Sequence, residues 1–246
     1  MQTTAILSAL AQEQSGLIAL LQRPTKVTHA GRDFWLGDLH GQNVVLSLSK
    51  IGKVAAATTS AALIERFGAQ RIVFTGVAGG LGDGVRVGDV VVATDFIQHD
   101  LDVSPLFARY EVPLYGRTRF GGDATLSALL FDAARSALVS TASDAAYPDA
   151  RVHRGLIASG DRFVSGAGES VALRSALANA GHNVLAVEME GAAVAQVCHD
   201  YGVPFAAVRT ISDRADDEAH VDFKLFLDQV AGVYTRNIIA SLFKLL

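Results

Sequence analysis

The most constraining feature of this sequence is a set of short apolar runs that are continuous and do not alternate with polar residues. They are Ala5–Leu10, Arg71–Thr75, Val90–Phe96, Gly155–Ser159, Asn183–Glu188 and Phe205–Ile211. Helical patterns, including Lys53–Phe67 and Gly191–Tyr201, lie between several of these runs. A strand that is apolar on both faces belongs to a sheet that is covered on both sides. The chain is therefore expected to form an α/β fold.

The other segments fit the same fold. Phe34–Leu39 and Val44–Ser49 flank the turn His40-Gly41-Gln42-Asn43, which predicts a β-hairpin. A long amphipathic helix is expected over Phe223–Leu246. No linker or repeat separates these elements, and 50% of the residues are hydrophobic. We therefore interpret residues 1–246 as one domain with a substantial core.

Several classes of function are disfavoured by charge and composition. The formal net charge is −4 and there is no basic run, which argues against nucleic-acid binding. No apolar stretch approaches the roughly 20 residues that span a bilayer. The N-terminal segment lacks the positive region of a signal peptide, so a cytoplasmic protein is expected. The single cysteine, Cys198, lies on an apolar helix face and is expected in the core.

The segment Gln98–Phe120 differs from the rest of the chain. It contains Pro105, Pro113 and several aromatic residues, with little periodicity. Loops of this length are usually functional or lie at an interface. Its His99, Asp100 and Asp102 are possible metal ligands, but no further ligand follows at a suitable spacing. Neither a metal nor a cofactor is expected.

Polar residues follow several of the predicted strands. Glu13 comes after the first, a glycine turn over 76–80 is expected after a central one, and Glu188, Glu190 and Ser212-Asp213 follow later strands. In open α/β sheets, ligands bind beyond the carboxyl ends of the strands. Carboxylates brought together there repel, so at least one should hold a proton near neutral pH. This pattern predicts an acid/base site.

Each of these residues also has a simpler explanation. Glu190 could stabilise a helix N-terminus, Asp213 could cap a helix, and Glu13 could be a solvated helix residue. The glycines could serve tight packing, because a glycine cluster is a weak signal by itself. Arg209 is harder to explain in this way, because an arginine within an apolar strand needs a carboxylate partner.

The same residues lie in motifs that resemble those of the 5′-methylthioadenosine/S-adenosylhomocysteine nucleosidases, within the nucleoside phosphorylase superfamily. The motifs, in order along the chain, are AQEQ (11–14), SKIGKVAAA (49–57), TGVAGGL (75–81), VGDVVVA (87–93), HDLDV (99–103), RGLIASGDRFVSG (154–166), VEMEGAAVAQVCHDYGVPF (187–205) and VRTISDRAD (208–216). The resemblance implies a three-layer α/β/α fold with a central mixed sheet. It also implies hydrolysis of the N-glycosidic bond of a thio-substituted adenosine by a homodimer.

The resemblance assigns a role to each candidate site residue. Asp213 would be the general acid that protonates adenine N7, and Glu13 the general base for the attacking water. Ribose would be held by Glu190, Met189, Glu188 and Arg209. Adenine would contact Phe163, Val164, Ser212, Ala78 and Gly79, and the alkylthio tail would contact Leu10, Ile51 and Phe223. Part of the 98–120 segment would reach the partner's site.

The resemblance also favours water over phosphate as the nucleophile. Phosphorylases of the superfamily hold phosphate with an arginine and a hydroxyl residue, and this chain has Phe74 and Val77 at those positions. Val77 and Ser8 differ from the serine and glycine common among the nucleosidases. A purine nucleoside phosphorylase is therefore the second hypothesis. A nucleosidase for aminodeoxyfutalosine or deoxyadenosine, and a binding protein without catalysis, are further alternatives.

Overall fold

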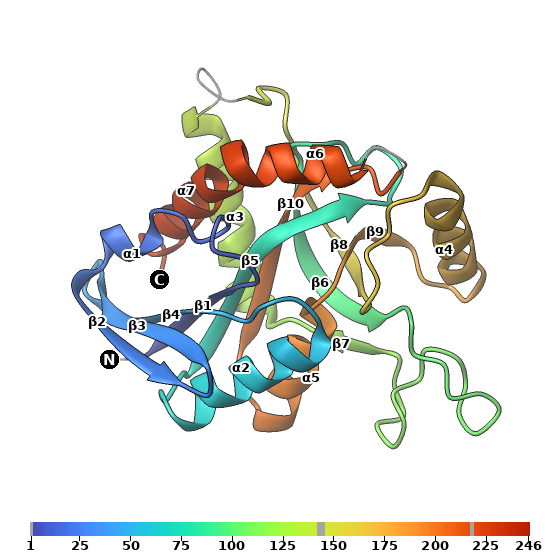
Figure 1. The fold of residues 1–246 in the computed structure, drawn as a ribbon, viewed down its shortest axis with the longest axis horizontal. Helices are drawn as coiled ribbons and strands as arrows, with labels where there is room; N and C mark the ends of the chain where they lie inside the picture. Colours follow the sequence, from blue (N-terminus) through green and yellow to red (C-terminus); the bar gives the residue numbers. More distant parts are fainter. Residues whose placement is uncertain (1, 142–145, 217–218) are drawn as a thin grey trace.

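The computed structural model describes residues 2–141, 146–216 and 219–246. Five strands of its mixed sheet close into a ring, because each is hydrogen-bonded to the next and the last returns to the first. In ring order they are β5 (Arg71–Gly80), β10 (Phe205–Asp213), β6 (Val90–Gln98), β8 (Val152–Ser159) and β9 (Val184–Glu188). The short strand β7 (Arg119–Gly121) pairs with β6. The ring occupies the centre of the molecule (Figure 1).

Four further strands extend the sheet outward from β5. Their order is β1 (Thr4–Ser8), β4 (Gln42–Leu48), β3 (Arg32–Leu39) and β2 (Gln22–His29). β1 is parallel to both β5 and β4, whereas β4, β3 and β2 pair antiparallel. The predicted hairpin is confirmed as β3 and β4. The polar strand β2, which the sequence pattern did not reveal, ends the sheet and is mostly exposed.

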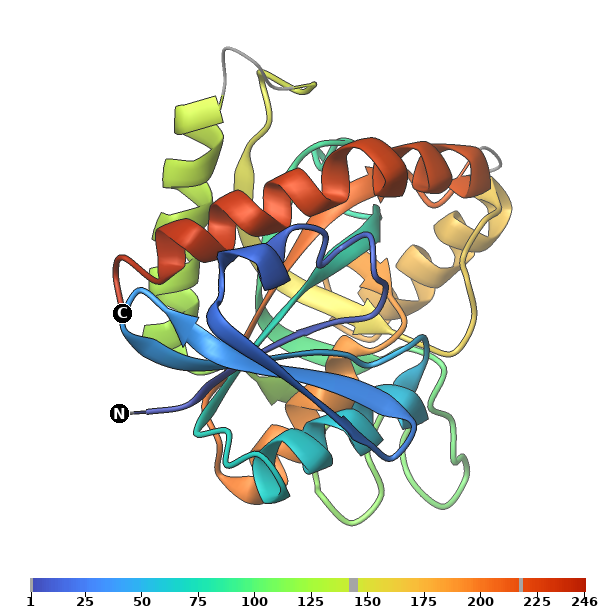
Figure 2. The same ribbon diagram turned by 60° about the vertical axis from the view of Figure 1, so that its left-hand side comes forward.

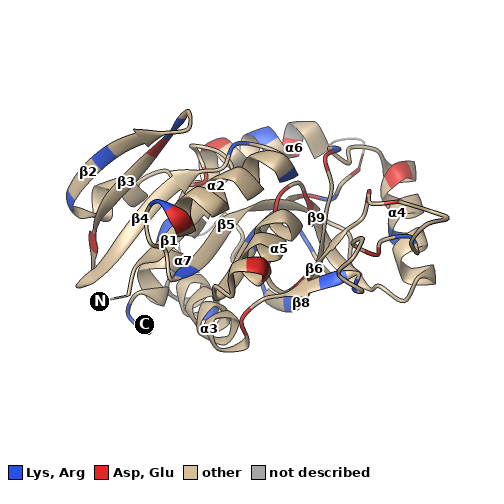
Figure 3. Cartoon of the chain, turned by 90° about the horizontal axis from the view of Figure 1, so that it is seen from below, with Lys and Arg blue, Asp and Glu red and all other residues tan. Residues whose placement is uncertain are grey.

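Helices cover both faces of the sheet and complete the three layers (Figures 1 and 3). Helices α2 (Lys53–Glu65) and α5 (Gly191–Tyr201) cover one face, and α3 (Ala124–Thr141) and α7 (Gly232–Leu242) cover the other. Neighbouring residues of one strand enter opposite cores: Leu7 packs on the α2 and α5 side, and Ile6 on the α3 and α7 side. The expected sheet, apolar on both faces, is confirmed.

The C-terminal helix differs from its prediction. It begins earlier, with α6 (Ala219–Phe226), passes through a π-helical turn over Leu227–Ala231, and ends with α7. Figure 2 shows this nearly continuous rod lying across the sheet. The short helix α1 (Leu17–Leu20) and the helix α4 (Ala167–Asn179) complete the fold.

The glycine-rich stretch 76–80 is not a turn after a strand, as we expected, but part of β5 itself. Its glycines allow close approach of other segments. A Cβ atom on Gly76 would lie 2.9 Å from Glu13 Oε1, and one on Gly79 would lie 3.0 Å from Asp213 Oδ1. The glycines therefore leave room for two acidic side chains against the strand.

Among the helices that the structure describes, none is both long and apolar enough to cross a membrane. The segment between β6 and β7 is largely irregular, as expected, with an isolated bridge between Val112 and Arg117.

Candidate active site

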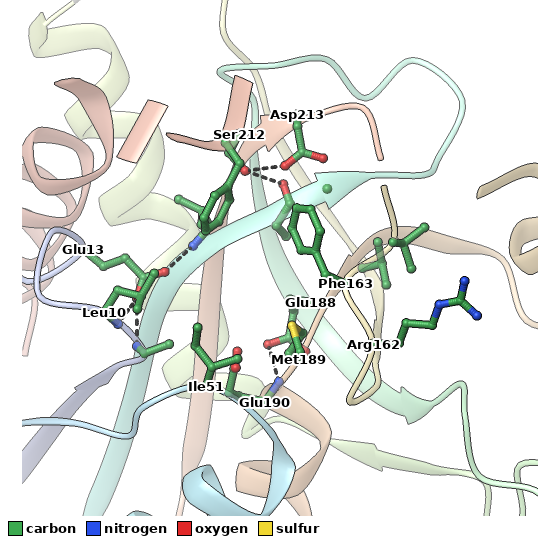
Figure 4. A pocket seen from close by; sticks show the side chains of 17 residues that line it. Leu10, Glu13, Ile51, Arg162, Phe163, Glu188, Met189, Glu190, Ser212 and Asp213 are labelled. Carbon is green, nitrogen blue, oxygen red and sulfur yellow. Dashed lines mark hydrogen bonds between the residues drawn. The ribbon is translucent and has the colours of Figure 1, made fainter. Parts of the chain in front are cut away.

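The predicted acidic residues meet in one cavity of about 300 Å³ at the carboxyl ends of β1, β5, β9 and β10 (Figure 4). The expected site residues that line it are Leu10, Glu13, Ile51, Ala78, Gly79, Phe163, Val164, Glu188, Met189, Glu190, Ser212, Asp213 and Phe223. Val77, a departure from the nucleosidase pattern noted above, also lines it, as do Ala9, Arg162 and Val187, which had no assigned role. Each of these four adjoins a predicted site residue in the sequence.

Glu13 is held by the backbone of two separate segments. The N–H groups of Ala9 and Leu10 both donate to Glu13 Oε2 at 2.8 Å, and the N–H of Val77 donates to Oε1 at 3.1 Å. Burial raises the pKa of Glu13, although the charge of Arg209 and the three N–H groups act in the opposite direction. The carboxyl group is therefore fixed in position and more basic than an exposed glutamate.

Arg209 does not line the cavity, contrary to the expectation that it would contact the ribose region. It lies behind Glu188, with its side chain only 1% exposed, and its Nη2 donates to Glu188 Oε2 at 2.6 Å. Its guanidinium carbon lies 3.9 Å from the centre of the Phe74 ring. The prediction that this buried arginine needs a carboxylate partner is confirmed.

Glu188 is further fixed by the start of α5. The Gly191 N–H donates to its two oxygens at 3.0 and 2.8 Å, and Ser159 Oγ donates to Oε1. Ser159 in turn accepts the Ala192 N–H at 2.8 Å. A helix N-terminus and an arginine together hold this side chain in place. Sequence reasoning gave neither Ser159 nor Gly191 a role. Ser159 lies far from Glu188 in the chain, and Gly191 lies inside a pattern that predicts a helix.

Glu190 lies at the N-terminal end of α5 but does not cap the helix with its side chain. Its Oε1 instead accepts the N–H of Gly52, at 2.8 Å, from the loop between β4 and α2. Burial, together with the nearby charge of Glu188, raises the pKa of Glu190 to about 8. The helix-end explanation for this residue is therefore insufficient, because the carboxyl group lies in the cavity.

Asp213 lies at the end of β10, on the opposite wall from Glu190 (Figure 4). Ser212 Oγ donates to its Oδ2 at 2.7 Å, and the Ala215 N–H donates to Oδ1 at 2.8 Å. Burial raises the pKa of Asp213, against the lowering effect of these two hydrogen bonds. Asp216 and Asp222 add to the increase. The group is thus prepared to carry a proton at a higher pH than an exposed aspartate.

The remaining wall of the cavity is apolar. The rings of Phe163 and Phe223 meet edge to face, with centroids 5.6 Å apart. Leu10 and Ile51 line another part of the wall, and Ile51 remains 52% exposed. An aromatic surface facing buried carboxyl groups suits a ligand that combines a flat ring with hydroxyl groups.

Asp100, in the acidic 98–102 segment, forms an ion pair and a backbone hydrogen bond. Asp100 accepts from Lys53 Nζ at 2.5 Å and from the Asp161 N–H at 2.9 Å. The described parts of the chain contain no group of three or more His, Cys, Asp or Glu side chains that could hold a metal ion. Asp100 instead joins the loops that contain Gly52 and Phe163.

A closed ring of strands, with buried acidic groups at strand ends around an apolar cavity, defines an α/β enzyme of the phosphorylase superfamily, and residues 3–243 match that family. A 5′-methylthioadenosine/S-adenosylhomocysteine nucleosidase from Bacillus thuringiensis (strain Al Hakam) is 37% identical over 237 residues, which cover 96% of each chain. The chain belongs to this nucleosidase family within the superfamily, and it is a hydrolase of nucleosides.

Solved structures agree with this assignment. The Neisseria meningitidis nucleosidase of the same name, in complex with methylthio-immucillin-A, has a TM-score of 0.88, 37% identity and full coverage of both chains. A futalosine hydrolase mutant of Helicobacter pylori has a TM-score of 0.87, 31% identity and full coverage of both chains. The relatives thus share the fold while their names give different nucleoside substrates.

Proposed function

We propose that this protein hydrolyses the N-glycosidic bond of 5′-methylthioadenosine, S-adenosylhomocysteine or both, releasing adenine. The observation that carries the proposal is that Glu13 and Asp213 line the same cavity while burial raises the pKa of each. One carboxyl group can then act as a base and the other as an acid in one reaction. The names of the B. thuringiensis and N. meningitidis relatives support the choice of substrate.

The proposed reaction uses the two groups on opposite sides of the sugar. Asp213 donates a proton to adenine N7 as the bond between C1′ and N9 breaks, so the base leaves without a negative charge. A water molecule attacks C1′ and gives its proton to Glu13. Glu190 binds the ribose hydroxyls and holds the sugar in position for this displacement. General acid and base contributions of this kind are typically about 10²–10⁴-fold in rate.

The cavity is better suited to water than to phosphate as the nucleophile. Phe74 lies in the core beneath Arg209, and Arg209 is paired with Glu188. Among the described residues that line the cavity, the basic one is Arg162, whose side chain is 74% exposed and bonded to Glu169 at 2.8 Å. A phosphate ion would face Glu13 and Glu190, and the charge of the nearby buried Arg209 is already balanced by Glu188.

A second substrate is supported by one comparison. The H. pylori relative named as a futalosine hydrolase matches over its full length. Aminodeoxyfutalosine therefore remains the alternative substrate, and deoxyadenosine would fit the same adenine wall. These nucleosides differ at the 5′ and 2′ positions and not in the bond that is cleaved.

The first experiment measures adenine release from 5′-methylthioadenosine in phosphate-free buffer and again with millimolar phosphate. Equal rates, with free methylthioribose as the product, are expected. A requirement for phosphate, with a ribose 1-phosphate as product, would assign the protein as a phosphorylase. No release in either buffer, with turnover of aminodeoxyfutalosine, would instead select the alternative substrate.

A further inference from the structure

A second cavity, of about 780 Å³, adjoins the active site. Ala9, Leu10 and Ile51 line both cavities. The second cavity lies between the loop that follows β1, the end of β4 and the hairpin of β2 and β3, on the side where α1 is drawn in Figure 1. Leu10 and Ile51 are also the proposed contacts of the alkylthio tail. A tail longer than a methyl group can therefore continue from the first cavity into the second.

The second cavity contains an arginine with an unused donor. Arg32 Nη1 donates to the carbonyl of Ala30 at 3.0 Å, and Nη2 donates to the carbonyl of Ala55 at 3.3 Å. Its Nε is buried and has no hydrogen-bond partner among the described residues. A buried N–H group without a partner is unfavourable, and a ligand with an acceptor oxygen would satisfy it.

Two further charged side chains line the same cavity. Lys50 is exposed, adjoins Ile51 in the sequence, and forms no ion pair with a described residue. Asp33 accepts from Lys26 Nζ at 3.2 Å and from Thr28 Oγ1 at 2.7 Å, and its side chain remains 46% exposed. Figure 3 shows residues of both signs on the β2 and β3 strands. The cavity thus offers groups of both charges to a ligand.

We propose that the second cavity binds the α-amino acid end of a long 5′-thioether substituent, such as the one in S-adenosylhomocysteine. Lys50 and Arg32 Nε bind the α-carboxylate, and Asp33 binds the α-ammonium group. The apolar stem of the substituent lies between Leu10 and Ile51. This inference rests on the proposed function and extends it, because it identifies the residues that separate long zwitterionic substrates from 5′-methylthioadenosine.

The chemistry of the cavity favours a zwitterion over an apolar tail. Charge-assisted hydrogen bonds to carboxylates are stronger than neutral ones, and an apolar tail would leave the Arg32 donor unsatisfied. A methyl group is too short to extend beyond Leu10 and Ile51. Lys50 is therefore expected to affect selectivity between substrates and not the chemical step.

The test compares three substrates that share the adenosine part: 5′-methylthioadenosine, 5′-butylthioadenosine, which has a long uncharged tail, and S-adenosylhomocysteine. Each kcat/KM is measured for the wild type, Lys50→Gln and the control Lys244→Gln, which removes the same charge at an exposed position outside both cavities. Lys50→Gln is expected to lower the ratio of S-adenosylhomocysteine to 5′-methylthioadenosine turnover about tenfold, through KM. The ratio of butylthio to methylthio turnover and the control should stay within twofold of the wild type.

Two outcomes would overturn the proposal: an unchanged S-adenosylhomocysteine ratio in Lys50→Gln, or an equal loss for the butylthio substrate. Failure of the proposed function itself is recognised separately, as wild-type enzyme that hydrolyses neither 5′-methylthioadenosine nor S-adenosylhomocysteine. In that case calorimetry of S-adenosylhomocysteine with the wild type and Lys50→Gln decides the question. Weaker binding to the variant supports the site, and equal or absent binding overturns it.

Discussion

Four acidic side chains share the active-site cavity, and each is held by its own set of hydrogen-bond donors. Backbone N–H groups hold Glu13, an arginine and a helix N-terminus hold Glu188, a single loop N–H holds Glu190, and a serine holds Asp213. Burial raises the pKa of Glu13, Glu190 and Asp213, while the hydrogen bonds to each of them act in the opposite direction. Such raised pKa values allow an acid and a base to act in the same cavity.

A substitution that removes the acidic group of Asp213 should stop the reaction. Asp213→Asn retains the size of the side chain but removes the acid, so kcat for adenine release is expected to fall about 10²–10⁴-fold. Stopped assays with separation of adenine measure the rate, and circular dichroism checks the fold. The matched control is Asp228→Asn, at an exposed position of the π-helical turn. Turnover of Asp213→Asn at the wild-type rate would contradict its role as the acid.

Glu190 should make the protein less stable as the pH rises. Its pKa is about 8 in the folded protein and 4.5 in an ordinary setting, so the folded state binds the proton more tightly than the unfolded state. The contribution to the free energy of unfolding is fully present below pH 4.5 and is lost as the pH rises through about 8. Urea unfolding at several pH values should show a smaller loss in Glu190→Gln than in the wild type. Parallel curves for the two proteins would contradict the assignment.

At the scale of elements, the site depends on loops that different strands contribute. Asp100 joins two of them, because it binds Lys53 Nζ and the Asp161 N–H, and Asp161 also accepts the Lys53 N–H at 2.8 Å. Lys53 follows Gly52, which binds Glu190, and Asp161 precedes Phe163 by two positions. The loop that binds Glu190 and the loop that carries Phe163 are thus joined through the carboxylates of Asp100 and Asp161.

Removal of the Asp100 carboxylate should loosen both of these loops together. Asp100→Asn is expected to lower kcat/KM about tenfold, mostly through KM, because a hydrogen bond to a charged group contributes roughly 1.5–3 kcal/mol. Asp102→Asn is the control from the same motif, since Asp102 is exposed and its distance to Arg109 Nε is 3.9 Å. Steady-state kinetics measure the effect on substrate binding, and thermal unfolding measures any effect on the stability of the fold. Equal kinetics in both variants would show that the link is unimportant.

The elements that the sequence predicted well are those whose signal is local. Strands with apolar residues on both faces, such as β6 and β10, were recognised because burial on two sides removes alternation. Helix α4 gives little sequence signal, because Leu177 is its one fully buried residue among those that the structure describes. The apolar spacing of α3 was present and would have been sufficient to predict it. The glycines of β5 were misinterpreted because neighbouring acidic groups, not a turn, require them.

The candidate site, like the fold, could be predicted from the sequence only where the signal is local. The carboxylates at strand ends, and the need of Arg209 for a partner, could be inferred from single segments. The bonds of Glu190 to Gly52 and of Glu188 to Ser159 join residues far apart in the chain. These bonds depend on the order of the strands in the ring, and no pattern within a single segment reveals that order.

At the scale of the whole molecule, the layer of α2 and α5 and the 98–120 segment expose large apolar side chains. Val54 is 79% exposed, Leu106 81% and Leu114 91%, and Tyr115 contacts α5 through its bond to Asp200. Large apolar side chains that remain exposed can mark a contact with another protein when they form one patch. We therefore expect two copies of the chain to associate through this layer.

Light scattering at micromolar concentration should give the mass of a dimer. Leu114→Asp should shift the protein toward the monomer, because it places a charge at the expected contact. Val139→Asp is the control, since Val139 is 80% exposed on α3, in the opposite helical layer. A monomeric wild type, or an equal shift in both variants, would contradict this interface.

The strand β2 has a consequence for how the protein behaves at high concentration. It is the last strand of the sheet, so one side of its backbone has no neighbouring strand. Such an edge can pair with the edge of another molecule and start aggregation. Here Pro24 lacks an N–H group, Lys26 adds a positive charge, and a bulge lies between Gln22 and Thr25. These three features obstruct edge-to-edge pairing. The sheet can therefore have an open edge at β2 without making the protein prone to fibril formation.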